Sequence, residues 1–230
     1  RADARLAALA VGIAFFAPGI EVLAFPAWDC LPYDRVSPRP ELVSRRINTL
    51  TRMLRPPKKG QGRVILTTVS ALLQRVPPKE AFTDAVMTLK AGQRLDPADL
   101  SGFLSTHGYF RANTVMEPGE YAPRGGIVDV FPCGAENPLR LDFFGDEVDQ
   151  IRTFSVADQR SLPGAVEAVD LLPGRELLLT ADVRARARQL AGEFAGLQGM
   201  LEKMAEGIPA EGMESLTPAL VPQMATLVDY

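Results

Sequence analysis

The sequence is poor in cysteine and histidine. Its 230 residues include two cysteines, Cys30 and Cys133, and a single histidine, His107. A zinc site built from cysteine and histidine alone needs about four ligands, so these residues cannot form one. Two cysteines are also too few for a disulfide scaffold, and reduced thiols of a cytoplasmic protein are the expected state. No apolar run approaches the ~18–20 residues of a membrane helix, so the sequence predicts no membrane span.

Motifs for nucleotide chemistry and covalent catalysis are missing as well. Gly60 and Gly62 follow Lys58 and Lys59, but no Lys-Ser/Thr pair follows at the spacing of a phosphate-binding loop. The sequence contains neither G-x-G-x-x-G nor G-x-S-x-G. Nothing places His107 beside a cysteine as a catalytic dyad would require. The sequence therefore predicts a chain that is not an enzyme and that uses no cofactor and no metal.

What the sequence does contain is ordinary for a folded protein. Hydrophobic residues make up 47% of the chain and charged residues 23%, which is enough apolar surface to build a core and excludes general disorder. The length suggests one or two domains. Because the chain opens on Arg1 without a signal-peptide pattern, we expect it to be a piece of a longer protein.

Charge is unevenly distributed along the chain. Residues 35–75 carry ten basic side chains against one acid, a net +9, whereas the whole chain has a net charge of −3. One interpretation is contact with the phosphates of duplex DNA, and the other is a solvated basic face of a helix and loop. The first interpretation is opposed by the overall acidity of the chain, whose pI is about 5.4. The candidate DNA contacts lie in one expected helix: Arg45, Arg46 and Arg52.

The first third of the sequence has the pattern of an α/β unit. Apolar spacing predicts helices over residues 1–17 and from residue 41 to before Pro56, and short apolar runs at 20–25 and 64–66 predict buried strands. Strands that alternate with helices are typical of a parallel sheet. We assign residues 1–77 to this first domain.

The pattern then changes to closely spaced strands. Asp96 and Pro97 predict the start of a helix that runs to about residue 106. Glycine, proline and aspartate turns separate the strands that follow. Residues 78–157 are therefore expected to form a small α+β domain with a mostly antiparallel sheet. Its expected strands cover residues 109–115, 120–123, 126–131, 139–144 and 147–154.

The last part, residues 158–230, is expected to be helical. Apolar residues from Val183 to Met204 recur at alternating steps of four and three, which predicts a helix with one continuous apolar stripe. Thr180 is the expected N-cap of this helix. Such a stripe more often belongs to a core than to a coiled coil.

The strongest candidate for a binding residue is Arg124. It stands directly before Gly125 and Gly126, which permit a tight bend and would leave its planar guanidinium exposed. An arginine in this position suits bidentate capture of a carboxylate on a partner protein. Pairing with a local acid, Glu120 or Asp129, is an equally open interpretation.

Several longer blocks, in order along the chain, resemble the bacterial transcription-repair coupling factor (Mfd) family, in its N-terminal UvrB-like region. The similarity covers roughly residues 24–176 and includes the stretch around Arg124. The blocks are Leu31-Pro32-Tyr33-Asp34, Arg45-Arg46-Ile47, Gly119-Glu120-Tyr121, Arg140-Leu141-Asp142-Phe143-Phe144 and Ile151-Arg152-Thr153-Phe154.

This resemblance implies an architecture and a partner. It implies a degenerate helicase-like (RecA-like) parallel-sheet domain, interrupted by an inserted α+β domain and resumed after it. The inserted domain is then expected to bind UvrA, the damage-recognition subunit of nucleotide excision repair. Arg124 and Gly125 match the key position of that surface, and Arg111 matches a second arginine less closely. Ala122 stands where UvrB has a third arginine.

The same resemblance implies a role in transcription-coupled repair. The chain would recruit UvrA to stalled-polymerase sites, without hydrolysing ATP itself. Binding of RNA polymerase and ATP-driven DNA translocation would belong to domains outside this chain, and those domains could mask the UvrA surface. The alternative function is a duplex-DNA-binding module that uses the basic segment, residues 35–75.

Overall fold

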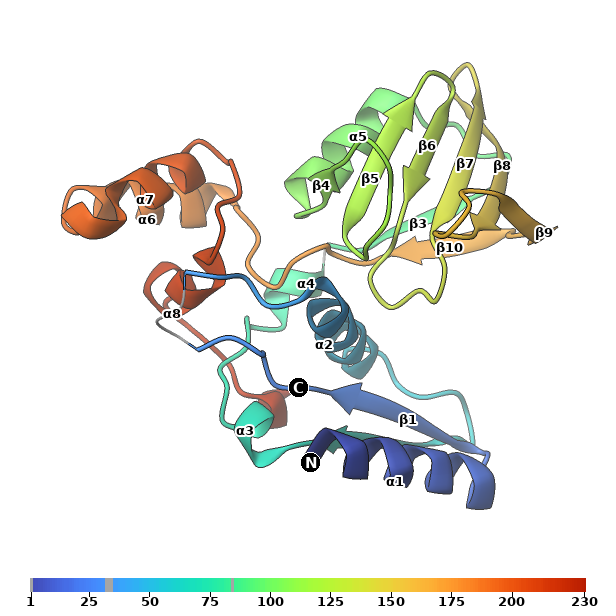
Figure 1. Ribbon diagram of the computed structural model, residues 1–230, viewed down its shortest axis with the longest axis horizontal. Coiled ribbons are helices and arrows are strands. Elements are labelled where there is room, and N and C mark those ends of the chain that lie inside the picture. The colour runs from blue at the N-terminus through green and yellow to red at the C-terminus, as the bar shows by residue number, and fades with distance from the viewer. Residues whose placement is uncertain (1, 32–34, 84) are drawn as a thin grey trace.

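Three groups of secondary structure follow one another in the computed structural model, which describes residues 2–31, 35–83 and 85–230 (Figure 1). A small α/β group comes first, a six-stranded sheet second, and a helical group last. Pro32, Tyr33 and Asp34, which belong to one of the blocks quoted above, lie outside the described residues. Within the described residues, no helix is both long and apolar enough to cross a membrane.

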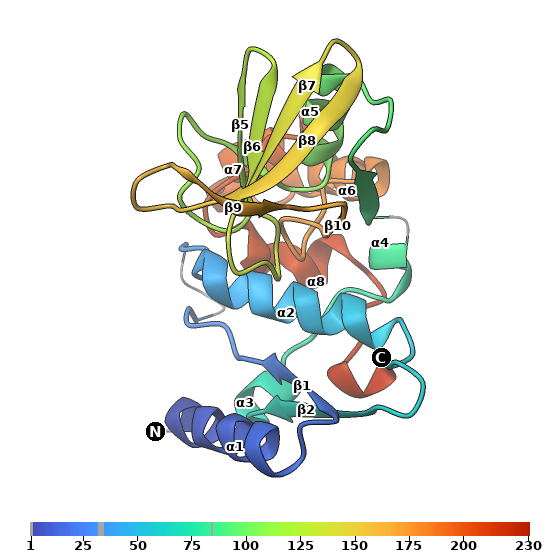
Figure 2. The same cartoon turned by 90° about the vertical axis from the view of Figure 1, so that its right-hand side faces the viewer.

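The first group contains a parallel strand pair between two helices. Strands β1 (Ile20–Phe25) and β2 (Gly62–Thr67) pair in parallel. Helices α1 (Ala2–Phe16) and α2 (Pro40–Met53) lie on opposite sides of the pair (Figures 1 and 2). Proline is favourable in the first turn of α2 because no intrahelical bond needs its missing N–H. The parallel sheet has two strands in the described part of the chain. The expected α/β character is therefore present, but a RecA-like parallel-sheet core is not shown.

The end of the chain packs back onto this first group. Phe25, Leu50, Val76 and Phe82 form a buried cluster with Leu227. Val76 and Ala225 exchange backbone hydrogen bonds, with N···O distances of 3.0 and 2.9 Å. Three short helices surround the cluster: α3 (Val69–Leu72), α4 (Glu80–Thr83) and the 3₁₀ turn η3 (Leu227–Asp229).

The second group is a mostly antiparallel sheet with the strand order β4-β5-β6-β7-β8-β9. Helix α5 (Pro97–Thr106) accompanies it, and the Asp96 side chain caps that helix by accepting a hydrogen bond from Ala98 N at 2.7 Å. The strands are β4 (Phe110–Arg111), β5 (Glu120–Arg124), β6 (Ile127–Val130), β7 (Leu139–Phe144), β8 (Glu147–Phe154) and β9 (Ser161–Ala165).

One expected strand is much shorter than the sequence pattern suggests. Residues 109–115 were expected to be extended, but β4 covers Phe110–Arg111 alone. Tyr109 is buried, and its hydroxyl donates to the Leu172 carbonyl at 2.6 Å. Val115 packs into a separate cluster with Ala122, Phe131 and Phe154. Both ends of the segment are therefore held by packing away from the strand ladder.

The sheet structure continues beyond the region expected to contain it. Strand β9 extends the large sheet to Ala165, and β10 (Ala168–Leu171) pairs antiparallel with β3 (Met87–Lys90). The segment expected to be helical from residue 158 thus begins with two strands. The domain boundaries at 77/78 and 157/158 stay predictions.

The long apolar stripe folds back on itself, so the expectation of one continuous stripe along a single helix is wrong. Helix α6 (Ala181–Ala191) is followed by its C-cap residue, Gly192. The 3₁₀ turn η1 (Ala195–Leu197) comes next and leads directly into helix α7 (Gln198–Ala205). Glycine disfavours helix continuation, and the turn lets the two halves of the stripe bury each other. The shared cluster contains Val183, Ala187, Leu190, Leu201 and Met204.

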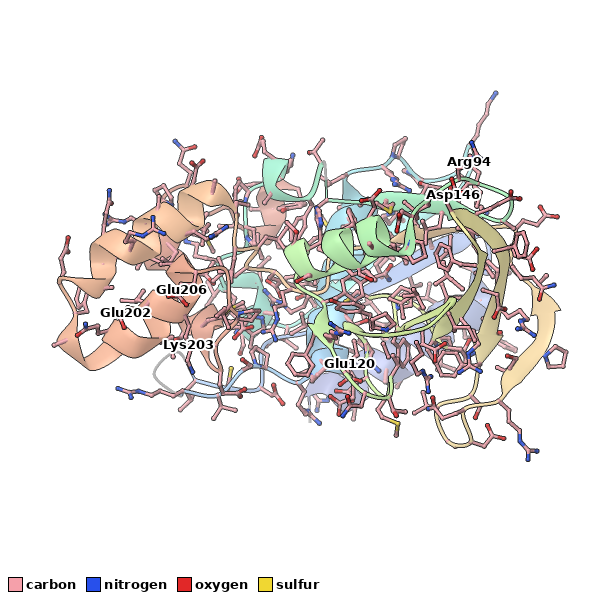
Figure 3. The ribbon with its side chains drawn as sticks, turned by 90° about the horizontal axis from the view of Figure 1, so that it is seen from above. Arg94, Glu120, Asp146, Glu202, Lys203 and Glu206 are labelled. Atoms are coloured by element: carbon pink, nitrogen blue, oxygen red, sulfur yellow. The ribbon has the colours of Figure 1, made fainter. Side chains whose placement is uncertain are left out.

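The helical group ends with two short turns, η2 (Met213–Leu216) and α8 (Thr217–Leu220). Thr180 caps α6 as predicted, since its side chain accepts from Val183 N. Figure 3 shows Glu202 and Lys203 of α7, and its C-cap residue Glu206, at the end of the molecule opposite Arg94 and Asp146.

Gly174 lies where two backbone segments touch. A Cβ atom at this position would stand 2.8 Å from the Gly108 carbonyl oxygen and 2.9 Å from Tyr109 N. Gly174→Ala is therefore expected to lower the free energy of unfolding by roughly 1–3 kcal/mol through overpacking. Gly102→Ala is the control, because a Cβ on this α5 residue would meet nothing within 4 Å and alanine favours a helix by up to ~1 kcal/mol. Urea denaturation measures both, and equal effects would contradict the packing argument.

Candidate protein-interaction surface

Arg124 lies at a tight hairpin turn. It ends β5, and Gly125 and Gly126 connect it to β6. Gly125 has a φ of 60°, and a positive φ at the first of two turn residues is typical of type II′ hairpins, which favour glycine there. A Cβ on Gly126 would stand 3.2 Å from the Phe143 carbonyl oxygen. Gly125 thus permits the turn, and Gly126 permits the close approach of the neighbouring strand. Arg124 is left at the edge of the bend.

The register of the sheet places Arg124 on a polar face. Val128 and Leu141 are cross-strand partners that point into the main core. Side chains alternate along a strand, so the neighbouring positions point to the opposite side. We call that side the outer face. It carries Arg124, Asp129, Arg140, Asp142 and Arg152.

The centre of the outer face is the buried carboxylate of Asp129. Arg140 donates two hydrogen bonds to it, from Nε to Oδ1 at 2.7 Å and from Nη2 to Oδ2 at 2.9 Å. Arg124 forms an ion pair with the same carboxylate through Nη2. The Asp129 carboxylate raises the pKa of the Arg140 guanidinium by hydrogen bonding. The Arg140 guanidinium also lies 4.7 Å from the centre of the Phe154 ring.

The two cations that hold Asp129 differ in exposure. Asp129 is 0% exposed, whereas the Arg124 side chain remains 48% exposed. Local pairing, which the sequence left open for Arg124, is therefore realised with Asp129. The other local acid, Glu120, instead accepts from the backbone N–H groups of Met116 at 2.7 Å and Glu117 at 3.0 Å. Arg124 is held in place at one nitrogen while about half of its side chain stays exposed.

Arg111 lies on the strand next to that of Arg124, but the two side chains belong to opposite sides of the sheet. It is exposed on β4, opposite Tyr121 of β5. Tyr121 points into the main core, and Arg124 is three positions further along β5, roughly 10 Å, with its side chain on the outer face. The structure therefore does not bring Arg111 and Arg124 together on one face. Ala122 is 1% exposed among Val115, Phe131 and Phe154, so this position presents no polar group to a partner.

Sequence reasoning missed the exposed aromatic side chains of the sheet, of which Phe144 is more exposed than Phe110. Phe144 is 84% exposed and directly precedes Gly145 at the β7–β8 turn. The β5–β6 and β7–β8 turns lie at the same end of the sheet (Figure 1). The alternation of buried Leu139, outward Arg140 and buried Leu141 was the signal that could have found it. Continued along the strand, this alternation predicts that the Phe144 ring points away from the core.

The basic segment does not present all of its arginines. Arg46 is 0% exposed, and its guanidinium donates to both Glu176 carboxylate oxygens. This burial removes Arg46 from the predicted set of DNA contacts. Arg45 is exposed, and Arg52 is half-exposed but forms an ion pair with Glu21. Contact of Arg45 and Arg52 with DNA stays a prediction.

Cys133 is a buried thiol in the loop between β6 and β7. Burial raises its pKa to about 12. At pH 8 the folded protein should therefore hold about a thousandfold less Cys133 thiolate than an ordinary cysteine with a pKa near 8.5. We expect iodoacetamide to leave Cys133 unmodified in the native chain and to alkylate it in urea, as measured by peptide mass spectrometry. Equal alkylation in both states would contradict this expectation.

Comparison with known proteins agrees with this geometry. Residues 87–177, which include the six-stranded sheet, match the family model described as the UvrB interaction domain. The chain therefore contains a domain of the UvrB interaction domain family.

The same comparison identifies relatives along most of the chain. It is 38% identical to the transcription-repair-coupling factor of Mycobacterium bovis over 88% of its length, and 34% identical to that of Myxococcus xanthus over 97%. Identity to the Escherichia coli protein is 43% over 67% of the chain. The chain belongs to the transcription-repair-coupling factor family. It spans 17% of the M. bovis protein, 20% of the M. xanthus protein and 13% of the E. coli protein.

Proposed function

We propose that this chain is a protein-interaction module that recruits UvrA in transcription-coupled repair. The observation that carries the proposal is the half-exposed Arg124 side chain on the outer face of the domain that matches the UvrB interaction family. Membership of the transcription-repair-coupling factor family supports the repair context. The proposed setting is the cytoplasm.

The contact to UvrA is proposed to use preorganised charge. The Asp129 carboxylate holds one nitrogen of Arg124, so little side-chain freedom remains to be lost on binding. The remaining guanidinium donors suit a carboxylate on UvrA, because an arginine fork matches the two oxygens of that group. Gly125 keeps the neighbouring surface free of a side chain. Arg111 is proposed as a second contact, made from the edge strand β4 rather than from the outer face.

The rest of the chain is proposed to be a scaffold without nucleotide chemistry. We infer that β1, β2, α1 and α2 are part of a degenerate helicase-like, RecA-like domain. The missing phosphate-binding loop supports the absence of ATP hydrolysis by this chain. RNA polymerase binding, DNA translocation and any masking of the outer face are proposed for parts of the family proteins that this chain does not cover.

Calorimetric titration of the purified chain with UvrA tests the proposal. We expect saturable binding with one site per chain. A matched titration with bovine serum albumin controls for unspecific association. Heat that is indistinguishable between UvrA and the control protein would overturn the proposed function.

A further inference from the structure

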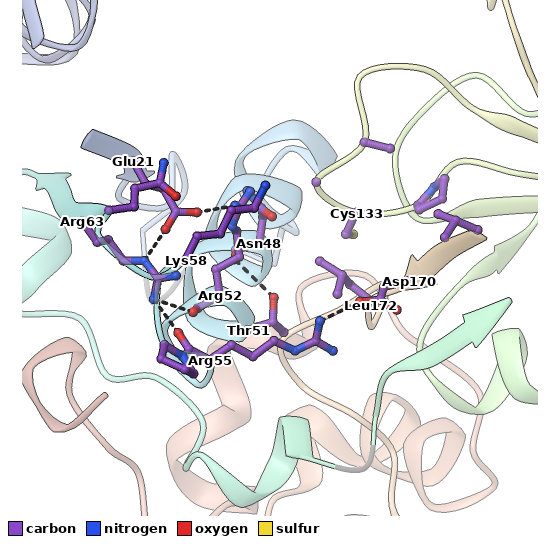
Figure 4. A pocket seen from close by; sticks show the side chains of 16 residues that line it. Glu21, Asn48, Thr51, Arg52, Arg55, Lys58, Arg63, Cys133, Asp170 and Leu172 are labelled. Carbon is purple, nitrogen blue, oxygen red and sulfur yellow. Dashed lines mark hydrogen bonds and ion pairs between the residues drawn. The ribbon is translucent and has the colours of Figure 1, made fainter. Parts of the chain in front are cut away.

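A cavity of about 380 Å³ lies between the first group and the sheet domain (Figure 4). Its walls come from the end of α2, the starts of β1 and β2, the loop around Cys133 and the end of β10. This volume falls in the range of small-molecule pockets, roughly 300–1,000 Å³. It can hold a small ligand.

The charged groups that line this cavity are mainly basic. Four of its side chains are cationic and two are acidic, which leaves a net charge of +2. The acids are Glu21 and Asp170, and the cations are Arg52, Arg55, Lys58 and Arg63. A concave site with excess positive charge attracts anions.

The two acids, Glu21 and Asp170, do not occupy all the hydrogen-bond donors of the four basic side chains. Arg63 is committed to structure, because it pairs with Glu21 and its Nη1 donates to the carbonyls of Arg52 and Arg55, both at 2.7 Å. Arg55 is different, because within the described part of the chain only its Nη1 donates, to Asp170 Oδ2 at 2.7 Å.

Lys58 leaves still more donor capacity. Among the described residues its ammonium group has no hydrogen-bond or ion-pair partner. An ammonium offers three donors and a guanidinium five. Lys58 and Arg55 therefore present unused cationic donors to one concave site.

We propose that this cavity binds the phosphate group of a small phosphorylated molecule. Phosphate oxygens accept charge-assisted hydrogen bonds from lysine and arginine, the groups that are left with unused donors here. Arg55 joins the first group to β10 through Asp170, so a bound phosphate would add a second acceptor at the junction and stabilise it. This site is separate from the outer face and does not depend on UvrA binding.

The test is thermal melting and calorimetry of the chain with inorganic phosphate, at pH 7 and constant ionic strength maintained with sodium chloride. We expect phosphate to raise the melting temperature above that in chloride alone, because a ligand that binds the folded state stabilises it. Lys58→Ala should weaken phosphate binding about tenfold, the typical effect of one lost charge-assisted hydrogen bond. Adenosine monophosphate should compete for the site and adenosine should not.

Lys59→Ala is the matched control. Lys59 is the next residue, is exposed and does not line the cavity, yet its loss removes the same charge from the same loop. Its phosphate affinity should equal that of the parent chain. Equal weakening by both variants, or equal melting temperatures in phosphate and chloride, would overturn the proposal. Lys58-dependent binding of a short DNA duplex without binding of phosphate would overturn it in favour of a DNA contact.

Discussion

Replacing Arg46 with alanine is expected to lower the free energy of unfolding by about 3–5 kcal/mol, the usual cost of leaving one member of a buried ion pair alone. Arg46 joins segments that are distant in sequence. Its Nη2 donates to Glu176 Oε2 at 3.0 Å, and its Nη1 donates to the Pro26 carbonyl at 3.0 Å and to Gln74 Oε1 at 2.9 Å. The guanidinium also lies 4.2 Å from the centre of the Phe25 ring. No other cation of the described residues pairs with the buried Glu176 carboxylate, so the loss of Arg46 would leave that charge unbalanced.

Urea denaturation followed by fluorescence measures this effect directly. Trp28 is the single tryptophan of the chain, and its indole N–H donates to Glu176 Oε1 at 3.1 Å. Arg45→Ala is the control, because Arg45 precedes Arg46 but is exposed, and its change should stay within about 0.5 kcal/mol. The double variant Arg46→Met with Glu176→Leu should recover much of the stability, since apolar replacement of a buried pair is often neutral. Equal losses for Arg45→Ala and Arg46→Ala would refute the assignment.

Replacing Arg124 with alanine is expected to weaken UvrA binding by about 2–5 kcal/mol, the range for one member of a charge pair buried in an interface. The fold should survive, because Arg140 keeps both of its hydrogen bonds to Asp129. We expect a stability loss of about 1 kcal/mol, since Arg124 also pairs with that buried carboxylate. Calorimetry with UvrA and urea denaturation of the same variant separate the two effects.

Two further variants sharpen the result. Arg124→Lys keeps the charge but loses the planar fork, so its affinity should fall between those of the parent and the alanine variant. Arg186→Ala removes an exposed arginine from α6, on the helical group, and should bind like the parent. A fall in melting temperature with unchanged affinity would show that Arg124 serves only to hold Asp129.

Local signals in the sequence were sufficient for several elements. Asp96 and Pro97 define the start of α5 because the cap and the first turn depend on neighbouring residues. Gly125 and Gly126 indicate a bend for the same reason, and the structure has a hairpin turn there. Motif resemblance also led to the family, which the comparisons confirm. It led to Arg124 as the candidate contact, and that role stays a prediction.

Other features required the tertiary structure. Periodicity from Val183 to Met204 is the same for one long helix and for two helices that bury each other, and packing selected the second. Asp129 and Glu120 are both near Arg124 in sequence, but Glu120 lies four positions away along β5, roughly 13 Å. The sheet register instead brings Asp129, on the neighbouring strand opposite Ala122, within reach of Arg124. The polar role of Arg140 depends on that same register.

The sequence by itself determined the composition, the residues that cap helices and form turns, and the family motifs. The separate roles of Arg45 and Arg46 were decided by the tertiary structure. Consecutive helical residues point about 100° apart, so one of the two arginines faces water while the other is enclosed. The Glu176 carboxylate that balances the enclosed charge lies 130 residues further along the chain. No local pattern can specify a partner at that separation, because only the folded chain brings the two groups together.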